Sequence, residues 1–150
     1  MINKNTVKQS LLDTLNGDVT LCGLLKVGKG SGAVFLGPDF PTKPPQRFVL
    51  VSILSSQQEL DETKFEFTGV AFTIAVKATP NSNGDDEALN DITQRIDALV
   101  DETPAALTLA DDLIVTLSHD STLSADTETI SSTTYLISQE RYELITTAKV

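Results

Sequence analysis

A glycine-rich segment near the start of the chain comes close to a phosphate-binding loop. Residues 23–30 read Gly-Leu-Leu-Lys-Val-Gly-Lys-Gly, so Lys29 stands where such a loop places its phosphate-binding lysine. The motif continues with Ser or Thr, whose hydroxyl holds Mg²⁺, but the next residue here is Gly30. The motif also needs a buried strand before it and a helix after it, whereas this sequence predicts a helix before it and a Gly/Pro-rich loop after it. We therefore interpret the segment as a flexible loop.

The residue types of a hydrolase triad occur next to one another at His119, Asp120 and Ser121. Adjacent residues of a strand point to opposite faces of a sheet, so these three do not line up as base, orienting acid and nucleophile. The chain also has no Gly-x-Ser-x-Gly nucleophile elbow. We predict that the protein is not an enzyme and has no catalytic residues.

Carboxylates cluster at residues 85–87 and 111–112, where a divalent cation could be held. A calcium loop requires oxygen ligands at spaced positions, and neither cluster has that pattern. Asp85, Asp86 and Glu87 instead suit the start of a helix, where the helix dipole favours each carboxylate by about 0.3–1 kcal/mol. The sequence predicts no bound metal and no cofactor.

The overall charge is strongly negative and unevenly placed. The 150 residues carry 11 Lys and Arg against 21 Asp and Glu, a net charge of −10. Residues 1–80 are nearly neutral, whereas residues 81–130 are acidic and contain Arg95 as their one Lys or Arg. Such a chain is poorly suited to neutralising the phosphates of nucleic acid. The acidic middle is either a solvated helix face or a surface that repels DNA or meets a basic partner.

Length and composition predict one domain over residues 1–150, since a hydrophobic content of 40% is enough for a single core. Cys22 is the only cysteine, so no internal disulfide is expected. Residues 1–8 lack the apolar region of a signal peptide, and no apolar run approaches the roughly 20 residues of a membrane span. We expect a protein made in a cytoplasm, with no membrane partner.

The hydrophobic pattern predicts two amphipathic helices and four long strands. The helices are expected at residues 6–15 and 86–101, the second with a core stripe of Leu89, Ile92, Ile96 and Leu99. The strands are expected at residues 47–56, 65–79, 113–119 and 133–147. The predicted fold class is therefore α+β: an antiparallel or mixed β-sheet with two helices packed on it.

Three connecting features complete this prediction. A long loop, residues 28–45, separates the first helix from the first main strand and contains a short strand at 33–36. Because long loops are usually functional, and because Lys29, Lys43 and Arg47 make this one basic, we identify it as a candidate assembly loop. The apolar alternation of the second strand slips at Gly69, a candidate β-bulge. Residues 121–129 are predicted to be a polar turn or mobile loop.

The order of these elements resembles the tail completion or tail terminator family of long-tailed bacteriophages. The opening helix Val7-Lys8-Gln9-Ser10-Leu11-Leu12 and the apolar turn at 19–25 match the family's start. The approach Pro44-Pro45-Gln46-Arg47 to the first strand is also similar. So are the run from the hairpin into a helix rich in acids and aliphatics, and the Arg141-Tyr142 pair of the closing strand.

This resemblance implies a structural virion protein of the tail or neck, without catalysis. Such subunits assemble with themselves, commonly as a hexameric ring, to cap the tail tube and to offer a surface to the head connector, while DNA passes passively through the lumen. Asp85, Asp86 and Asp91 then become candidates for lining the lumen or the contact between subunits. Two alternatives stay open: another virion joint protein, such as a head–tail connector component or a tail tube subunit, and a small enzyme with an unrecognised site.

Overall fold

A single sheet organises the structure, a computed structural model that describes residues 4–26, 33–37, 40–58, 65–78, 84–101, 112–130 and 132–148. The elements are α1 (Lys4–Asn16), α2 (Val19–Leu25), β1 (Ala33–Leu36), β2 (Arg47–Gln58), β3 (Phe65–Lys77), α3 (Gly84–Val100), β4 (Asp112–Ile130) and β5 (Thr133–Ala148). The strands follow the order β1-β2-β3-β5-β4. Short β1 runs parallel to β2, and the other neighbours are antiparallel.

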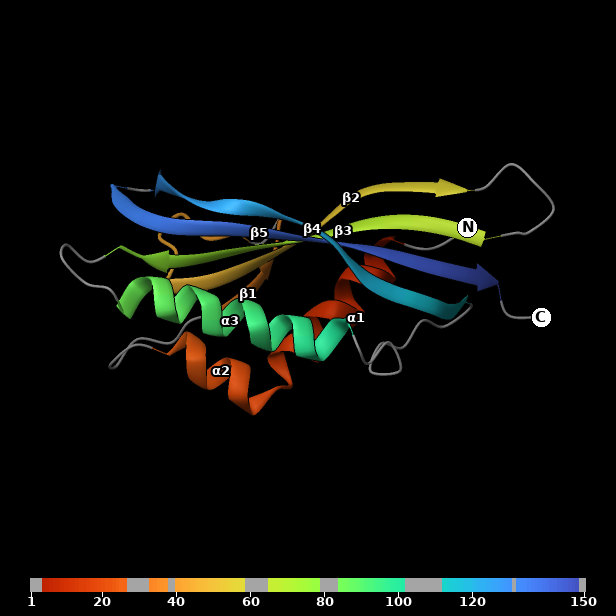
Figure 1. Cartoon of the computed structure of the whole chain (residues 1–150), viewed down its shortest axis with the longest axis horizontal. Helices are drawn as coiled ribbons and strands as arrows, with labels where there is room; N and C mark the ends of the chain where they lie inside the picture. The colour runs from red at the N-terminus through yellow and green to blue at the C-terminus, as the bar shows by residue number, and fades with distance from the viewer. Residues whose placement is uncertain are drawn as a thin grey trace.

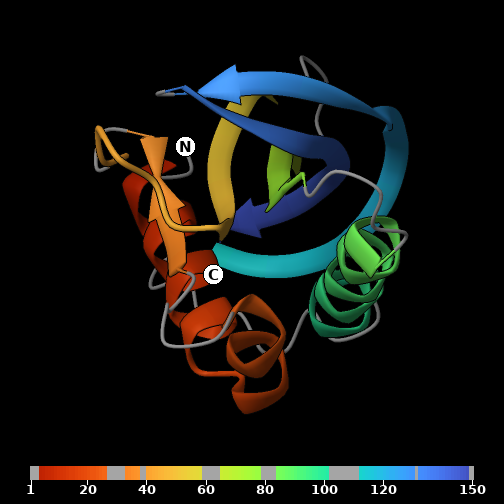
Figure 2. The ribbon, with the colours of Figure 1, turned by 90° about the vertical axis from the view of Figure 1, so that its left-hand side faces the viewer.

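All three helices lie on the same side of the twisted sheet, which is the lower side in Figure 1. Helix α1 packs against β1 and β2, α3 packs against β3, β5 and β4, and α2 contacts both other helices. Figure 2 looks along the molecule and shows α1 and β1 on its left, with α3 and the arc of β4 on its right. The main core fills the space between helices and sheet, and its fully buried members include Leu11, Leu21, Val51, Phe72, Ile74, Ile92, Ile96 and Leu144.

A smaller aromatic cluster lies on the helix-free face, at the end of the sheet where β2 begins. Phe48 and Tyr135 are buried there with ring centroids 5.3 Å apart, and Phe40 packs on Phe48 at 5.1 Å. The hydroxyl of Tyr135 donates a hydrogen bond to the carbonyl oxygen of Pro45 at 3.1 Å. The proline-rich segment 40–46 is therefore held against the sheet by this cluster.

The expectation of two helices on the sheet is wrong, because the described residues form three helices and the strands account for most of the regular structure. The additional helix is α2. Asp18 precedes it with extended backbone, and its carboxylate accepts a hydrogen bond from the backbone N–H of Leu21 at 2.8 Å. This side-chain cap satisfies a free N–H group of the first turn and so stabilises a seven-residue helix. The short strand expected at 33–36 is confirmed as β1.

Two expectations about the strands are also wrong. Residues 121–129 are not a loop, since β4 continues through them to Ile130 and pairs with β5. Three register shifts bend this edge strand along its length, which explains how a hydroxyl-rich sequence without clear alternation stays in the sheet. Gly69 is not a bulge: β3 pairs with β5 in unbroken register there, and the irregularity lies in β2, between Ile53 and Ser55.

The predicted core stripe of the long helix is confirmed. Leu89, Ile92 and Ile96 are 5%, 0% and 0% exposed. Leu99 is partly buried and packs against the same core. Within the described part of the chain, no helix is long and apolar enough to cross a membrane.

Candidate functional site

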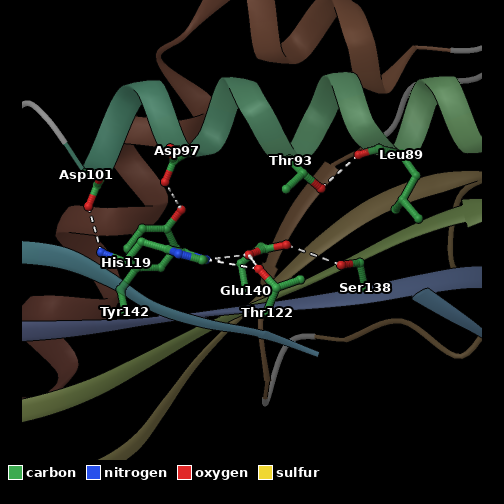
Figure 3. A network of polar contacts seen from close by, with 9 residues as sticks. All are labelled: Leu89, Thr93, Asp97, Asp101, His119, Thr122, Ser138, Glu140 and Tyr142. Carbon is green, nitrogen blue, oxygen red and sulfur yellow. Dashed lines mark hydrogen bonds and ion pairs between the residues drawn. The ribbon is translucent and has the colours of Figure 1, made fainter. Parts of the chain in front are cut away.

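A buried carboxylate on β5 joins β4 to β5 beneath α3 (Figure 3). Glu140 is 3% exposed. Its Oε2 atom accepts a hydrogen bond from Thr122 Oγ1 at 2.6 Å and lies 2.7 Å from His119 Nε2. Its Oε1 atom accepts a hydrogen bond from Ser138 Oγ at 3.3 Å. These contacts offset the loss of hydration that a buried carboxylate suffers.

The same cluster fastens the last turns of α3 to β4 and β5. Tyr142 Oη donates a hydrogen bond to Asp97 Oδ1 at 2.8 Å, and the backbone N–H of His119 donates one to Asp101 Oδ1 at 2.6 Å. The rings of His119 and Tyr142 meet edge to face, with centroids 5.1 Å apart. Burial raises the pKa of the Tyr142 phenol far above its ordinary value, and the hydrogen bond to Asp97 adds to the rise. Tyr142 therefore acts as a neutral donor.

His119, Glu140 and Thr122 have the side-chain types of a catalytic relay, in which a hydroxyl is the nucleophile, a histidine the base and a carboxylate the acid that orients the histidine. Such a relay uses both ring nitrogens of the histidine, one toward the nucleophile and the other toward the acid. Here Nε2 alone lies near both partners, 2.7 Å from Glu140 and 3.2 Å from Thr122. The Thr122 hydroxyl already donates its proton to Glu140. This geometry ties β4 to β5 and does not form a relay.

The three adjacent residues considered from the sequence are separated by the strand. His119 lies on the helix-facing side with Tyr142, whereas Asp120 lines a groove on the helix-free face. A register shift between His119 and Ser121 falls at the same point of β4. His119 and Asp120 therefore lie on opposite faces of the sheet, as expected for adjacent residues of a strand.

The groove on the helix-free face has a volume of about 330 Å³. It surrounds Gly69, and its lining includes Leu54, Phe67, Arg141 and Glu143. Leu54 is 47% exposed beside the irregularity in β2. Arg141 Nε donates a hydrogen bond to Gln139 Oε1 at 3.0 Å. The lining combines both signs of charge with apolar side chains.

The structure separates the residues of the candidate assembly loop. Lys43 is exposed in the segment that covers the aromatic cluster. Arg47 begins β2, and its Nη1 atom donates a hydrogen bond to the carbonyl oxygen of Leu24 at 2.7 Å, which ties β2 to the end of α2. Arg47 therefore has a role within the subunit. Lys29 lies outside the described residues.

The candidate acids lie together on the first half of α3. Asp86 and Asp91 are exposed, Asp85 is partly exposed, and Glu87 is exposed beside them. The polar cluster around Glu140 is built instead on the last turns of this helix, at Asp97 and Asp101. Asp86 and Asp91 are thus exposed on α3 and take no part in that cluster.

Sequence reasoning missed Glu140 as an organising residue. Its position carried a signal, because it alternates with Leu136, Tyr142 and Leu144 on the core-facing side of a predicted strand. A carboxylate at a core position requires partners, and a search for them could have pointed to His119. Among the described residues, no group of three or more His, Cys, Asp or Glu side chains is placed to hold a metal ion.

No known protein family and no curated protein matches the sequence. Among solved structures, a chain of the virion of a native gene transfer agent particle has a similar fold, with a TM-score of 0.64 and 13% sequence identity. The similarity covers 93% of this chain and 94% of that chain. At this identity the match establishes a shared fold over most of both chains.

Proposed function

We propose that the protein is a structural subunit of a phage-like virion. The observation that supports this most is the fold shared with a virion chain over 93% of one chain and 94% of the other. Fold by itself does not determine function. The proposal therefore also rests on the polar contacts of Glu140, which join β4 to β5, and of Tyr142, which holds α3 on the sheet, because these contacts have a structural use.

Within the virion, we assign the protein to the head–tail junction as a tail terminator or completion protein. In this role it forms a hexameric ring that caps the tail tube and presents a surface to the head connector. The order of its elements and the Arg141-Tyr142 pair, which resemble that family, support the assignment. Its net charge of −10 suits a lumen that DNA passes without sticking, because like charges give no gain from counterion release.

Native mass spectrometry of the purified protein, followed by electron microscopy with tail tubes from the same genome, tests this role. We expect a closed ring that binds one end of each tube and stops its growth. A single copy on the tail axis of the assembled particle contradicts the assignment. Tubes that grow without limit in the presence of the protein contradict it as well.

A second virion role, as a head–tail connector component or a tail tube subunit, is also compatible with a fold shared with a virion chain. The same experiment separates the three roles. A tube subunit polymerises into tubes by itself, and a connector component binds the head portal but not the free end of a tube. A terminator binds the tube end and does not polymerise.

A further inference from the structure

The charged residues of the fold are divided between two flanks. The basic flank, defined as α1, β1 and residues 40–47, carries Lys4, Lys8, Lys43 and Arg47 against one acid, Asp13. The acidic flank, defined as residues 84–101 and 112–130, carries ten acids, one histidine and a single Lys or Arg, Arg95. Figure 2 shows α1 and β1 on the left of the molecule and α3 on the right, while β4 runs around the right-hand side and ends at the upper left.

The surface of the acidic flank is more negative than its total charge suggests. Asp86, Glu87 and Asp91 are exposed on the outer side of α3. Arg95 does not offset them, because its guanidinium binds both carboxylate oxygens of Asp18 at 2.8 and 2.7 Å. On the other flank, Lys43 is exposed and Lys8 is partly exposed.

Among the described residues, no ion pair joins the two flanks, although their helices α1 and α3 contact each other. The exposed charges of the two flanks are therefore available to another molecule. Unlike patches on different sides of a subunit make a head-to-tail contact, which repeats and can close into a ring.

We infer that the acidic flank of one copy docks against the basic flank of a second copy, with Glu87 and Asp91 facing Lys8 and Lys43. This inference rests on the proposed ring-forming function and specifies its interface. It assigns the outer acids of α3 to the contact between subunits and not to the lumen.

Two charge-reversal variants, one for each flank, test whether the two flanks bind each other. Variant A carries Glu87→Lys and Asp91→Lys, which makes both flanks positive. Variant B carries Lys8→Glu and Lys43→Glu, which makes both flanks negative. Each variant alone should lose the ring at low ionic strength, as seen by native mass spectrometry. An equal mixture should regain closed rings in which the two variants alternate, so each ring contains an even number of subunits.

Two control variants reverse a charge at positions outside both flanks. Glu143→Lys on β5 and Lys77→Glu on β3 change exposed charges on central strands, and both should keep the ring. Circular dichroism spectra that overlay those of the wild type exclude unfolding as the reason for a lost ring. Raising the salt concentration to about 1 M shortens the Debye length to about 3 Å and should weaken the wild-type ring.

The outcomes separate this inference from the function on which it rests. Wild-type rings that persist unchanged in variant A or in variant B overturn the charge pairing and leave the ring role intact. Folded variants that lose the ring and do not recover it on mixing also overturn the pairing. A wild-type protein that stays monomeric, both alone and on tail tubes, overturns the ring role itself.

Discussion

Arg95 on α3 clamps the carboxylate of Asp18, the residue that caps the start of α2. The Nε and Nη2 atoms of Arg95 donate hydrogen bonds to Oδ2 and Oδ1 of Asp18 at 2.8 and 2.7 Å. The same Oδ2 atom accepts the backbone N–H of Leu21 at 2.8 Å. One carboxylate therefore both completes the first turn of α2 and fixes α2 against α3. The side chains are 14% exposed for Asp18 and 34% for Arg95, so the pair is partly shielded from solvent.

Replacement of Asp18 should destabilise the protein in a graded way. Asp18→Ala removes both the cap and the ion pair, and loss of the cap alone typically costs about 1 kcal/mol. Asp18→Asn keeps a good capping side chain but loses the charge and one of the two oxygens that accept from Arg95, so it should lower the free energy of unfolding less than Asp18→Ala. Urea unfolding at neutral pH measures both. Equal losses in the two variants contradict a capping role.

The charge of Asp18 also gives a pH dependence with a definite sign. The hydrogen bond from Arg95, helped by the N–H of Leu21, holds the pKa of Asp18 below its ordinary value of 3.8. The folded state therefore prefers the ionised carboxylate, and its stabilisation is complete above about pH 4 and is lost as the pH falls through the lowered pKa. The stability gap between wild type and Asp18→Asn should be constant from pH 7 to pH 5 and should close in the acid range. A gap that widens on acidification contradicts this sign.

Ile96→Ala should destabilise the protein strongly. Ile96 is 0% exposed in the main core, and truncation of a buried Leu or Ile to Ala typically costs about 2–5 kcal/mol. Gln94→Ala, at an exposed position of the same helix, is the control and should stay within about 0.5 kcal/mol of wild type. Thermal unfolding of both variants makes the comparison. Equal melting temperatures would mean that this face of α3 does not pack on the sheet.

The same substitution at two threonines should have opposite effects. Thr146 is 1% exposed and its hydroxyl makes no hydrogen bond. Such an unsatisfied group costs about 1–3 kcal/mol, so Thr146→Val should raise the free energy of unfolding. The Thr122 hydroxyl donates to buried Glu140 at 2.6 Å, so Thr122→Val should lower that free energy by about 1 kcal/mol or more. Denaturant unfolding of the pair is the measurement. A destabilised Thr146→Val would mean that the hydroxyl has a hydrogen-bond partner in the folded protein.

Residue patterns in the sequence predicted those features of the fold that depend on one helix or strand alone. The stripe from Leu89 to Leu99 identified the buried face of α3, because a helix repeats its apolar positions by its own geometry. The strand at Ala33–Leu36 was found in the same way. Strand β4 was only half predicted, because its second half is held by pairing with β5 and not by its own alternation. Tertiary context overrode local pattern there.

The polar clusters could not be predicted from local sequence patterns, because their members are far apart in the chain. Asp18 and Arg95 are 77 positions apart, and His119 and Glu140 are 21 apart. No spacing rule joins such pairs before the topology is known. Two features of the sequence could have pointed to these clusters. One is Arg95, an isolated cation in an acidic stretch, and the other is the carboxylate of Glu140 at a core-facing position of β5. Each marks a charge that needs a partner, without naming the partner.

The protein should bind neither ATP nor duplex DNA with micromolar affinity. In the segment that resembles a phosphate-binding loop, Gly23 to Leu25 end the helix α2, and the next described element is the strand β1. A phosphate-binding loop needs the reverse order, strand then helix, so that backbone N–H groups of a helix start point at the phosphates. The net charge of −10 opposes DNA contact. Calorimetric titration with Mg²⁺-ATP and with a short duplex at low salt, where charge attraction is least screened, is the measurement. Micromolar ATP binding that disappears in Lys29→Ala, while Lys43→Ala keeps it, would overturn the structural role and favour the enzyme alternative.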